Sequence, residues 1–283
     1  MVIALARLGH HVGWVSRLPE NPLGRRIARE IAAHGVDTSR IVWIPDGKVG
    51  LLFIESGTAP RGNLVLYDRG NTAIAGLQTR DLPMDYLTSA RMLFLTGVTP
   101  ALSATCRTAW IAAAKAARDA GSFVAVDINY RSKLWSTDTA KETLEQVFPY
   151  CDLVISSLTD LQSIFGMPKD AHLAAESFRA AFHVPLVVLT LGAQGAMAQD
   201  STGPAQFHPV FPTDTVDRIG SGDAFAAGFV HGWFERDVAW GLRCGCASAA
   251  LKQTYRGDAT WSRLEELNQL VSGGEVDPHR VQR

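Results

Sequence analysis

Short apolar runs and amphipathic stretches alternate along most of the chain, with turn-forming residues between them. The short apolar runs predict strands at residues 11–16, 41–44, 92–96, 123–128, 153–156, 186–191 and 196–199. Apolar residues three and four positions apart predict helices at residues 1–8, 22–34, 100–120, 137–148, 171–182, 238–252 and 261–271, and another from residue 224 onward. Strands that alternate with helices indicate an α/β fold, in which helices cover both faces of a doubly wound, mostly parallel sheet.

The alternation is interrupted between residues 48 and 72. Residues 51–55 and 63–67 predict two strands that are joined by a loop rich in glycine, proline and serine, with no helix between them. We interpret residues 48–72 as a small β lid, inserted between a first core segment (residues 1–47) and the main core domain (residues 73–283). Residues 273–283 are predicted to form a disordered tail.

Composition and charge narrow the class of protein. The 283 residues have a net charge of −1, which gives no reason to expect nucleic acid or an anionic membrane as a partner. Cys106, Cys151, Cys244 and Cys246 lack the spacing of metal ligands, and the last two lie in an alanine-rich apolar segment. We therefore expect buried free thiols and a cytoplasmic location.

The sequence Gly220-Ser221-Gly222-Asp223 stands directly before an apolar helical stretch. Glycines in that position allow backbone N–H groups to point toward one anion, and the helix N-terminus adds its positive dipole end. A carboxylate beside such a phosphate site would repel the phosphate unless it accepts a proton from an attacking hydroxyl group. The alternative is an ordinary helix start at which Asp223 is the N-cap.

The pattern Asp217-x-x-Gly220-x-Gly222-Asp223-Ala-Phe-x-x-Gly-Phe resembles the C-terminal signature of the ribokinase-like (PfkB) carbohydrate kinases. The resemblance implies that ATP is the phosphoryl donor with Mg²⁺, that Asp223 is the catalytic base, and that Gly220, Ser221 and Gly222 form the anion hole. Arg218 and Ile219 depart from the commonest form, so binding of a monovalent cation stays open. The chain has no P-loop and no Rossmann glycine fingerprint.

Two further segments carry candidate acceptor contacts. Asp127, Asn129 and Arg131 occupy alternate positions at the end of a predicted strand and would share one of its faces. Their spacing is similar to the substrate segment of 2-keto-3-deoxygluconate kinases and fructokinases; the alternative is a solvated strand end. The pattern Tyr67-x-Arg69-x-x-Thr-Ala resembles the lid strand of the former kinases, in which both side chains reach the sugar acid; the alternative is a charged sheet edge.

The nucleotide and metal contacts rest on weaker motifs. Thr190, Gly192 and Gly195 match the family's nucleotide loop in their place ahead of Asp223, although a hairpin turn has the same appearance. Asp160 keeps a carboxylate where the family has Asn-x-x-Glu, which holds Mg²⁺ through water.

Together these resemblances imply an ATP-dependent carbohydrate kinase whose acceptor is a sugar acid, 2-keto-3-deoxygluconate before others. A fructokinase or another PfkB sugar kinase is the alternative, and a catalytically impaired relative that binds sugar or nucleotide is an alternative of another class. We expect a homo-oligomer formed through the lid, with no nucleic acid or membrane partner. Residues 1–9 resemble the middle of the family's first helix, so we also expect the natural chain to begin upstream.

Overall fold

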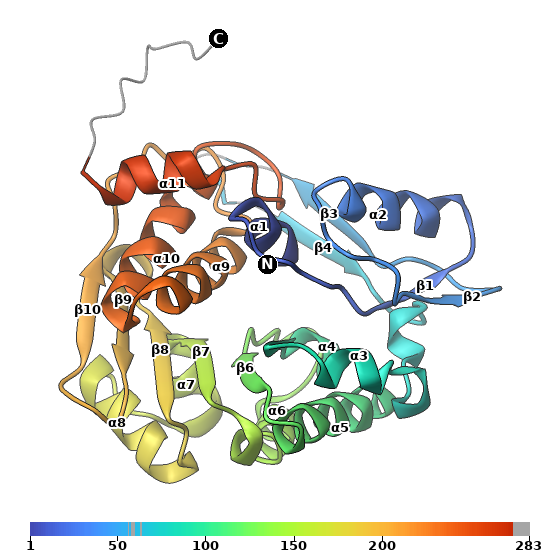
Figure 1. The fold of residues 1–283 in the computed structure, drawn as a ribbon, viewed down its shortest axis with the longest axis horizontal. Helices are drawn as coiled ribbons and strands as arrows, with labels where there is room; N and C mark the ends of the chain where they lie inside the picture. The colour runs from blue at the N-terminus through green and yellow to red at the C-terminus, as the bar shows by residue number, and fades with distance from the viewer. Residues whose placement is uncertain (56, 58–59, 63, 274–283) are drawn as a thin grey trace, which may run out of the picture. The chain divides into compact units, whose positions relative to one another are not determined.

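The computed structural model describes residues 1–273, except residues 56, 58–59 and 63 (Figure 1). It separates into two compact units. The first unit comprises Met1–Gly13, Ala33–Asp37 and Leu153–Arg283, and the second comprises Trp14–Ala32 and Thr38–Asp152. The first residue of the strand predicted at 63–67 and most of the predicted tail lie outside the described residues.

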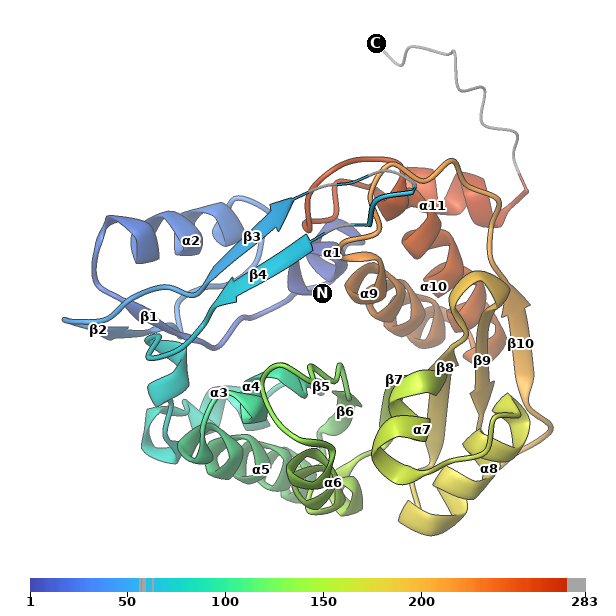
Figure 2. The same ribbon diagram turned by 180° about the vertical axis from the view of Figure 1, so that it is seen from behind.

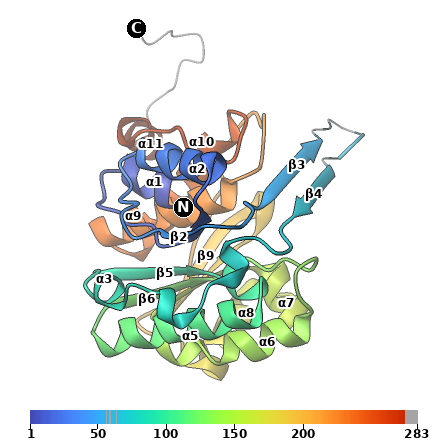
Figure 3. The same cartoon turned by 90° about the vertical axis from the view of Figure 1, so that its right-hand side faces the viewer.

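The first unit is built on strands β7 (Leu153–Ser157), β8 (Leu186–Thr190), β9 (Gly195–Gln199) and β10 (Gln206–Pro209). β7 and β8 are parallel, whereas β9 runs antiparallel to β8 and β10 antiparallel to β9. All but the last residue of β7, β8 and β9 are buried, because helices cover both faces of these strands. Figure 3 shows α7 (Leu158–Phe165) and α8 (Ala171–Phe182) on one face, with α9 (Ser221–Glu235) and α10 (Val238–Gln253) on the other.

Helix α9 is buried along most of its length, since residues 224–232 are all buried. It packs along α10 at close range (Figure 2). A Cβ atom on Gly228 would lie 2.5 Å from the backbone oxygen of Cys244, so only glycine allows this approach. Helix α1 (Val2–Arg7) also contacts α9, and Nε2 of His10 lies 2.9 Å from Nδ1 of His231. These contacts hold α9 firmly in the first unit.

The predicted free thiols are confirmed. All four cysteines are free and buried. Burial raises the pKa of the Cys244 thiol to about 11 and that of the Cys246 thiol to about 12, so both are neutral at physiological pH.

The second unit contains the parallel pair β5 (Met92–Thr96) and β6 (Phe123–Asp127), with α4 (Val98–Ala101) and α5 (Ala104–Asp119) between them in the chain. A second parallel pair, β1 (Arg17–Pro19) and β2 (Val42–Ile44), is connected by α2 (Pro22–Ala32). The shorter helix α3 (Met84–Thr88) packs against α5, and α6 (Thr137–Glu145) follows β6.

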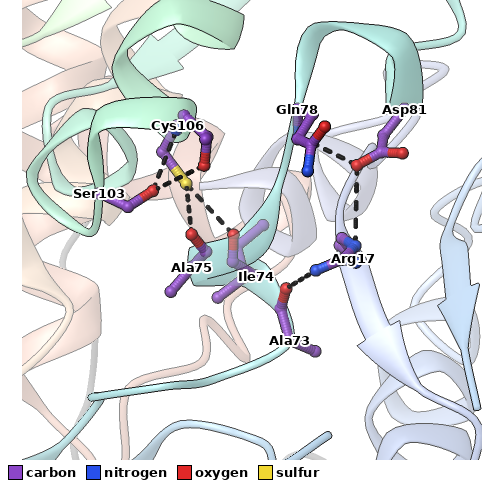
Figure 4. A network of polar contacts seen from close by, with 9 residues as sticks. Arg17, Ala73, Ile74, Ala75, Gln78, Asp81, Ser103 and Cys106 are labelled. Carbon is purple, nitrogen blue, oxygen red and sulfur yellow. Dashed lines mark hydrogen bonds and ion pairs between the residues drawn. The ribbon is translucent and has the colours of Figure 1, made fainter. Parts of the chain in front are cut away.

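Arg17 connects β1 to the segment that precedes α3 (Figure 4). Its Nη1 donates to the carbonyl oxygen of Ala73 at 2.7 Å, and its Nε lies 3.7 Å from Oδ2 of Asp81. The next segment reaches α5, because the Cys106 thiol donates to the carbonyl oxygen of Ile74 at 3.2 Å. Residues of the second unit that are far apart in sequence are thus held by partly buried polar contacts as well as by apolar packing.

Strands β3 (Leu51–Glu55) and β4 (Leu64–Asp68) form the predicted antiparallel hairpin, with Leu51 opposite Asp68. Both faces of the hairpin expose large apolar side chains, which is unusual for a strand pair in a globular protein. They belong to Leu51, Leu52, Phe53, Ile54, Leu64, Leu66 and Tyr67.

The α/β class is confirmed, but several elements differ from their predictions. Residues 11–16 contain only an isolated bridge from Gly13 to Asp37, and the strand lies further on, at β1, where it finds a parallel partner in β2. The helix predicted at 100–120 is interrupted because Ser103 leaves the helical conformation to cap α5. Helix α7 and strand β10 were not predicted. Among the described residues, no helix has the length and apolar character needed to cross a membrane.

Candidate active site

Helix α9 begins at Ser221, three residues before its predicted start, and its start differs from that of the other helices with ten or more residues whose caps are described. Helices α5, α6, α7, α8 and α10 are each capped by a side-chain oxygen that accepts an N–H of the first turn. The capping residues are Ser103, Ser136, Ser157, Asp170 and Asp237. The N-cap of α9 is Gly220, which offers no such oxygen. The Ser221 N–H donates to the carbonyl oxygen of Arg218 at 3.2 Å, which leaves the amides of Gly222 and Asp223 as first-turn donors. An anion is the natural acceptor for these donors.

The two glycines of the motif have different tasks. Gly220 has φ +80°, and a Cβ atom there would lie 2.3 Å from the carbonyl oxygen of Asp258. A side chain is therefore excluded both by conformation and by space. A Cβ atom on Gly222, in contrast, would meet no atom within 4 Å. The helix start therefore borders open space, in which a phosphate-sized group can approach the backbone.

Asp217 holds the turn that precedes α9. Its Oδ1 accepts the N–H of Ile219 at 3.0 Å, and its Oδ2 accepts the N–H of Gly257 at 3.1 Å. No role was predicted for Asp217, although an aspartate that bonds an N–H two residues further on is a common turn signal. The carboxylate ties the turn to a loop that is forty residues away in sequence.

Asp223 lies in the first turn of α9 with half of its side chain exposed. The alternative prediction, that Asp223 is the N-cap, is wrong because Gly220 takes that position. Oδ1 of Asp223 lies 3.5 Å from the amino group of Met1. The carboxylate is accessible to a small molecule at the same helix start as the Gly222 amide. Its role as a base stays a prediction.

The predicted nucleotide and metal residues lie at the ends of two neighbouring parallel strands. Thr190 ends β8 opposite Ser157, which ends β7 and caps α7 by accepting the N–H of Asp160 at 3.0 Å. Ligands of α/β folds collect at the carboxyl ends of parallel strands. Gly192 and Gly195 form the turn from β8 to β9, closed by the Leu191 N–H and the Gly195 carbonyl oxygen at 2.8 Å. Hairpin geometry alone accounts for both glycines, so their contact with a nucleotide stays a prediction.

The residues present would fit Mg²⁺ only as an ion held largely by phosphates. Among the described residues, no three His, Cys, Asp or Glu side chains gather into a metal site. Asp160 offers a single carboxylate in the first turn of α7. Mg²⁺ commonly keeps several water molecules and binds one or two carboxylates together with substrate phosphates. Asp160 therefore suits a contact through water.

In the second unit, the segment after β6 does not continue as a strand. Asn129 has φ +41°, a left-handed conformation that ends the extended backbone. The prediction that Asp127, Asn129 and Arg131 share one strand face is therefore wrong. The turn instead brings the Asn129 amide to Oδ2 of Asp127 at 3.2 Å. Asp127 and Asn129 lie together, whereas Arg131 projects from an exposed loop.

Arg131 instead belongs to a group of positive charges at the end of the hairpin, which we name the basic cluster: Arg69 and Lys133 over the ring of Tyr67, with Arg131 near enough to act on Arg69. The Arg69 guanidinium lies 4.4 Å and the Lys133 ammonium 5.9 Å from that ring. Burial lowers the pKa of Arg69; Tyr67 raises it, and the charge of Arg131 lowers it further. Among the described residues, none of the three cations forms an ion pair with a carboxylate. The basic cluster is thus suited to an anionic ligand.

Comparisons with known proteins cover almost the whole chain. The model of pfkB family carbohydrate kinases matches residues 1–265. A 2-dehydro-3-deoxygalactonokinase from Haloferax volcanii is 37% identical over 277 residues, which cover 98% of this chain and 86% of the relative. The structure of a 2-dehydro-3-deoxygluconokinase from Thermotoga maritima gives a TM-score of 0.90 at 28% identity, covering 96% of this chain and 87% of that one. A ribokinase II candidate from E. coli, in complex with ATP and Mg²⁺, gives 0.84 at 22% identity over 96% of this chain and 86% of that one.

The two glycines of the helix start provide a matched pair of substitutions. Gly220→Ala should lower the free energy of unfolding by at least about 1–2 kcal/mol. Alanine is strained in the left-handed conformation, and its Cβ atom would also clash with the carbonyl oxygen of Asp258. Gly222→Ala should leave stability unchanged or raise it by up to about 1 kcal/mol, since alanine favours a helix. Urea unfolding of both variants measures the difference, and equal stabilities would contradict the described turn.

Proposed function

The chain belongs to the pfkB family of carbohydrate kinases, and we propose that it transfers the γ-phosphoryl group of ATP to a hydroxyl group of 2-keto-3-deoxygluconate. The basic cluster is the observation that carries the choice of a sugar acid. Among the described residues the three cations have no carboxylate partner, which a neutral sugar would not provide, whereas the carboxylate of a sugar acid can accept paired hydrogen bonds from a guanidinium. The names of the relatives from Haloferax volcanii and Thermotoga maritima support this class of acceptor.

Phosphoryl transfer is assigned to the start of α9. Asp223 accepts the proton of the attacking hydroxyl group, which makes the oxygen a better nucleophile. The amides of Gly222 and Asp223 donate to the oxygens of the transferring phosphoryl group, on which negative charge is spread. Gly220 contributes through its turn, which orients these donors. The uncapped first turn supports this assignment.

The nucleotide is assigned to the strand ends of the first unit. Thr190 and the turn from Gly192 to Gly195 contact ATP, and Asp160 contacts Mg²⁺ through water. Mg²⁺, when bound, neutralises charge on the phosphates during transfer. The E. coli structure with ATP and Mg²⁺ supports this pair of ligands.

The acceptor is assigned to residues of the second unit. Arg69 and Arg131 bind the carboxylate of the acceptor. The Tyr67 ring packs against the Arg69 guanidinium and so holds it in position. Asp127 and Asn129 bind hydroxyl groups, because a carboxylate accepts and an amide both donates and accepts hydrogen bonds.

Two other acceptors and one other class of function are distinguished by a single screen. The 37% identical relative favours the galactonate epimer of the sugar acid. Fructose would be favoured if the basic cluster held no ligand, and a catalytically impaired relative would consume no ATP with any acceptor. Coupled measurement of ATP consumption across sugars and sugar acids separates these cases.

We also propose that residues 48–72 act as a lid and as the contact of a homo-oligomer in the cytoplasm. The apolar side chains on both faces of the hairpin support an interface, since water-exposed patches of this kind mark association surfaces.

Replacing the base should separate chemistry from binding. We expect Asp223→Asn to reduce kcat by roughly 10²–10⁴-fold, the usual contribution of a general base, and to leave ATP affinity within a few fold. Asp138→Asn is the control, because Asp138 is an exposed carboxylate in the first turn of α6. Near-normal turnover by Asp223→Asn would remove the assigned base.

Arg69→Ala should distinguish acidic from neutral acceptors. The lost charge-assisted hydrogen bond is worth about 1.5–3 kcal/mol, so kcat/KM should fall roughly 10- to 100-fold for the sugar acid and far less for fructose. Arg61→Ala on the same hairpin is the control, since its partner is Glu55. Equal losses on both acceptors, or no activity with any sugar acid, would favour a fructokinase.

The lid interface predicts an oligomer that depends on the hairpin. Light scattering after size-exclusion chromatography should show a dimer or larger species, and Phe53→Ser with Leu66→Ser should yield monomers. Phe53 and Leu66 pair across the hairpin, and each is 56% exposed. Leu173→Ser on α8 is the control for an exposed leucine elsewhere. A monomeric parent protein would exclude the interface.

A further inference from the structure

Lys252 is a charged side chain without any solvent exposure, placed in the last turn of α10. Lysine is rarely buried to this extent unless its ammonium group is paired. Here Nζ donates to the carbonyl oxygen of Tyr255 at 3.2 Å and lies 4.9 Å from the centroid of the Tyr255 ring. The ring is itself fixed, because the Tyr255 hydroxyl accepts the N–H of Trp261 at 2.8 Å. The ammonium group is thus held in one place.

Two carboxylates act on this ammonium group. Burial lowers the pKa of Lys252, while the charges of Asp217 and Asp258 raise it. The two aspartates come from different segments, 216–220 and 255–258, and the positive charge of Lys252 attracts both of them. Asp217 is partly buried and Asp258 is exposed, so the buried ammonium group is attracted by one shielded and one solvated carboxylate.

The same two segments form the support of the α9 start. Asp217 accepts N–H groups from both segments, from Ile219 and from Gly257. The Gly220 turn lies directly against the carbonyl oxygen of Asp258. The amides of residues 216 and 217 donate to the carbonyl oxygen of Gln253, the residue after Lys252. Gln253, the neighbour of Lys252 in the chain, therefore anchors the first segment, and the Lys252 ammonium group contacts the second segment at the carbonyl oxygen of Tyr255.

We propose that Lys252 is a positioning residue whose ammonium group serves as a built-in counter-cation for segments 216–220 and 255–258, and so fixes the first-turn amides of α9 for phosphoryl transfer. The proposal rests on the proposed function of those amides. A buried charge seldom adds net stability over an apolar residue, because its desolvation is costly. What a fixed charge does provide is one arrangement of the oxygen atoms around it. An enzyme with this internal cation needs no monovalent cation from solution.

The first experiment compares cations with the unaltered protein and with Lys252→Gln, which keeps a donor for the Tyr255 carbonyl oxygen but not the charge. Turnover is measured in ammonium chloride, potassium chloride and tetramethylammonium chloride at equal ionic strength. The parent protein should respond equally to all three. Lys252→Gln should lose at least about tenfold in kcat, with KM for ATP within a few fold, and should recover activity in ammonium or potassium but not in tetramethylammonium.

Lys169→Gln, at an exposed lysine of the same unit, is the control and should match the parent protein. Three results would each overturn the proposal: unchanged kcat in Lys252→Gln, a loss that small cations do not restore, or activation of the parent protein by potassium. A lysine that only stabilises the fold would give the second result.

A readout without turnover separates this proposal from the proposed function. The melting temperature of Lys252→Gln should rise in ammonium or potassium relative to tetramethylammonium, while that of the parent protein should not. If the parent protein phosphorylates no acceptor, the proposed function fails, and this shift still decides whether the site holds a cation. If no shift appears, the counter-cation is excluded whatever the activity.

Discussion

The start of α9 depends on a left-handed backbone turn that glycine adopts without steric cost. At Gly220 the chain reverses against the carbonyl oxygen of Asp258 and enters a helix without a side-chain cap. The absent cap leaves first-turn donors for another acceptor, and the half-exposed carboxylate of Asp223 lies in the same turn. First-turn backbone donors and a half-exposed carboxylate are thereby placed together by one local conformation.

The rest of the first unit keeps this conformation in place. Below the first turn α9 is buried, and its glycines allow α10 to pack at backbone distance. Asp217 ties the turn to the loop after α10, and the buried Lys252 at the end of α10 donates to the Tyr255 carbonyl oxygen of the same loop. Apolar packing fixes the axis of the helix, whereas buried polar groups fix its end. Apolar packing and polar contacts therefore determine different features of α9, namely its direction and the conformation of its first turn.

The second unit, considered by itself, gathers positive charge at the end of its hairpin. Its basic cluster combines residues from the hairpin and from the loop after β6, which are about sixty positions apart in sequence. The charge of Arg131 disfavours the charged form of Arg69, and an anion bound beside both would offset this repulsion. The hairpin that carries Arg69 also exposes apolar side chains, so one short segment combines candidate ligand contacts with a candidate interface.

The sequence by itself determined the elements that depend on local pattern. The apolar run of β5 and the amphipathic period of α8 have the predicted limits, and Gly220 to Asp223 were recognised as a helix start because glycine and aspartate have strong local preferences. Only the tertiary structure decided the rest. Strand β1 forms where a parallel partner is available, and Asn129 turns left-handed where a strand was expected. The burial of Lys252 likewise depends on loops that approach only after folding, because burial and charge partners are properties of packing rather than of neighbouring residues.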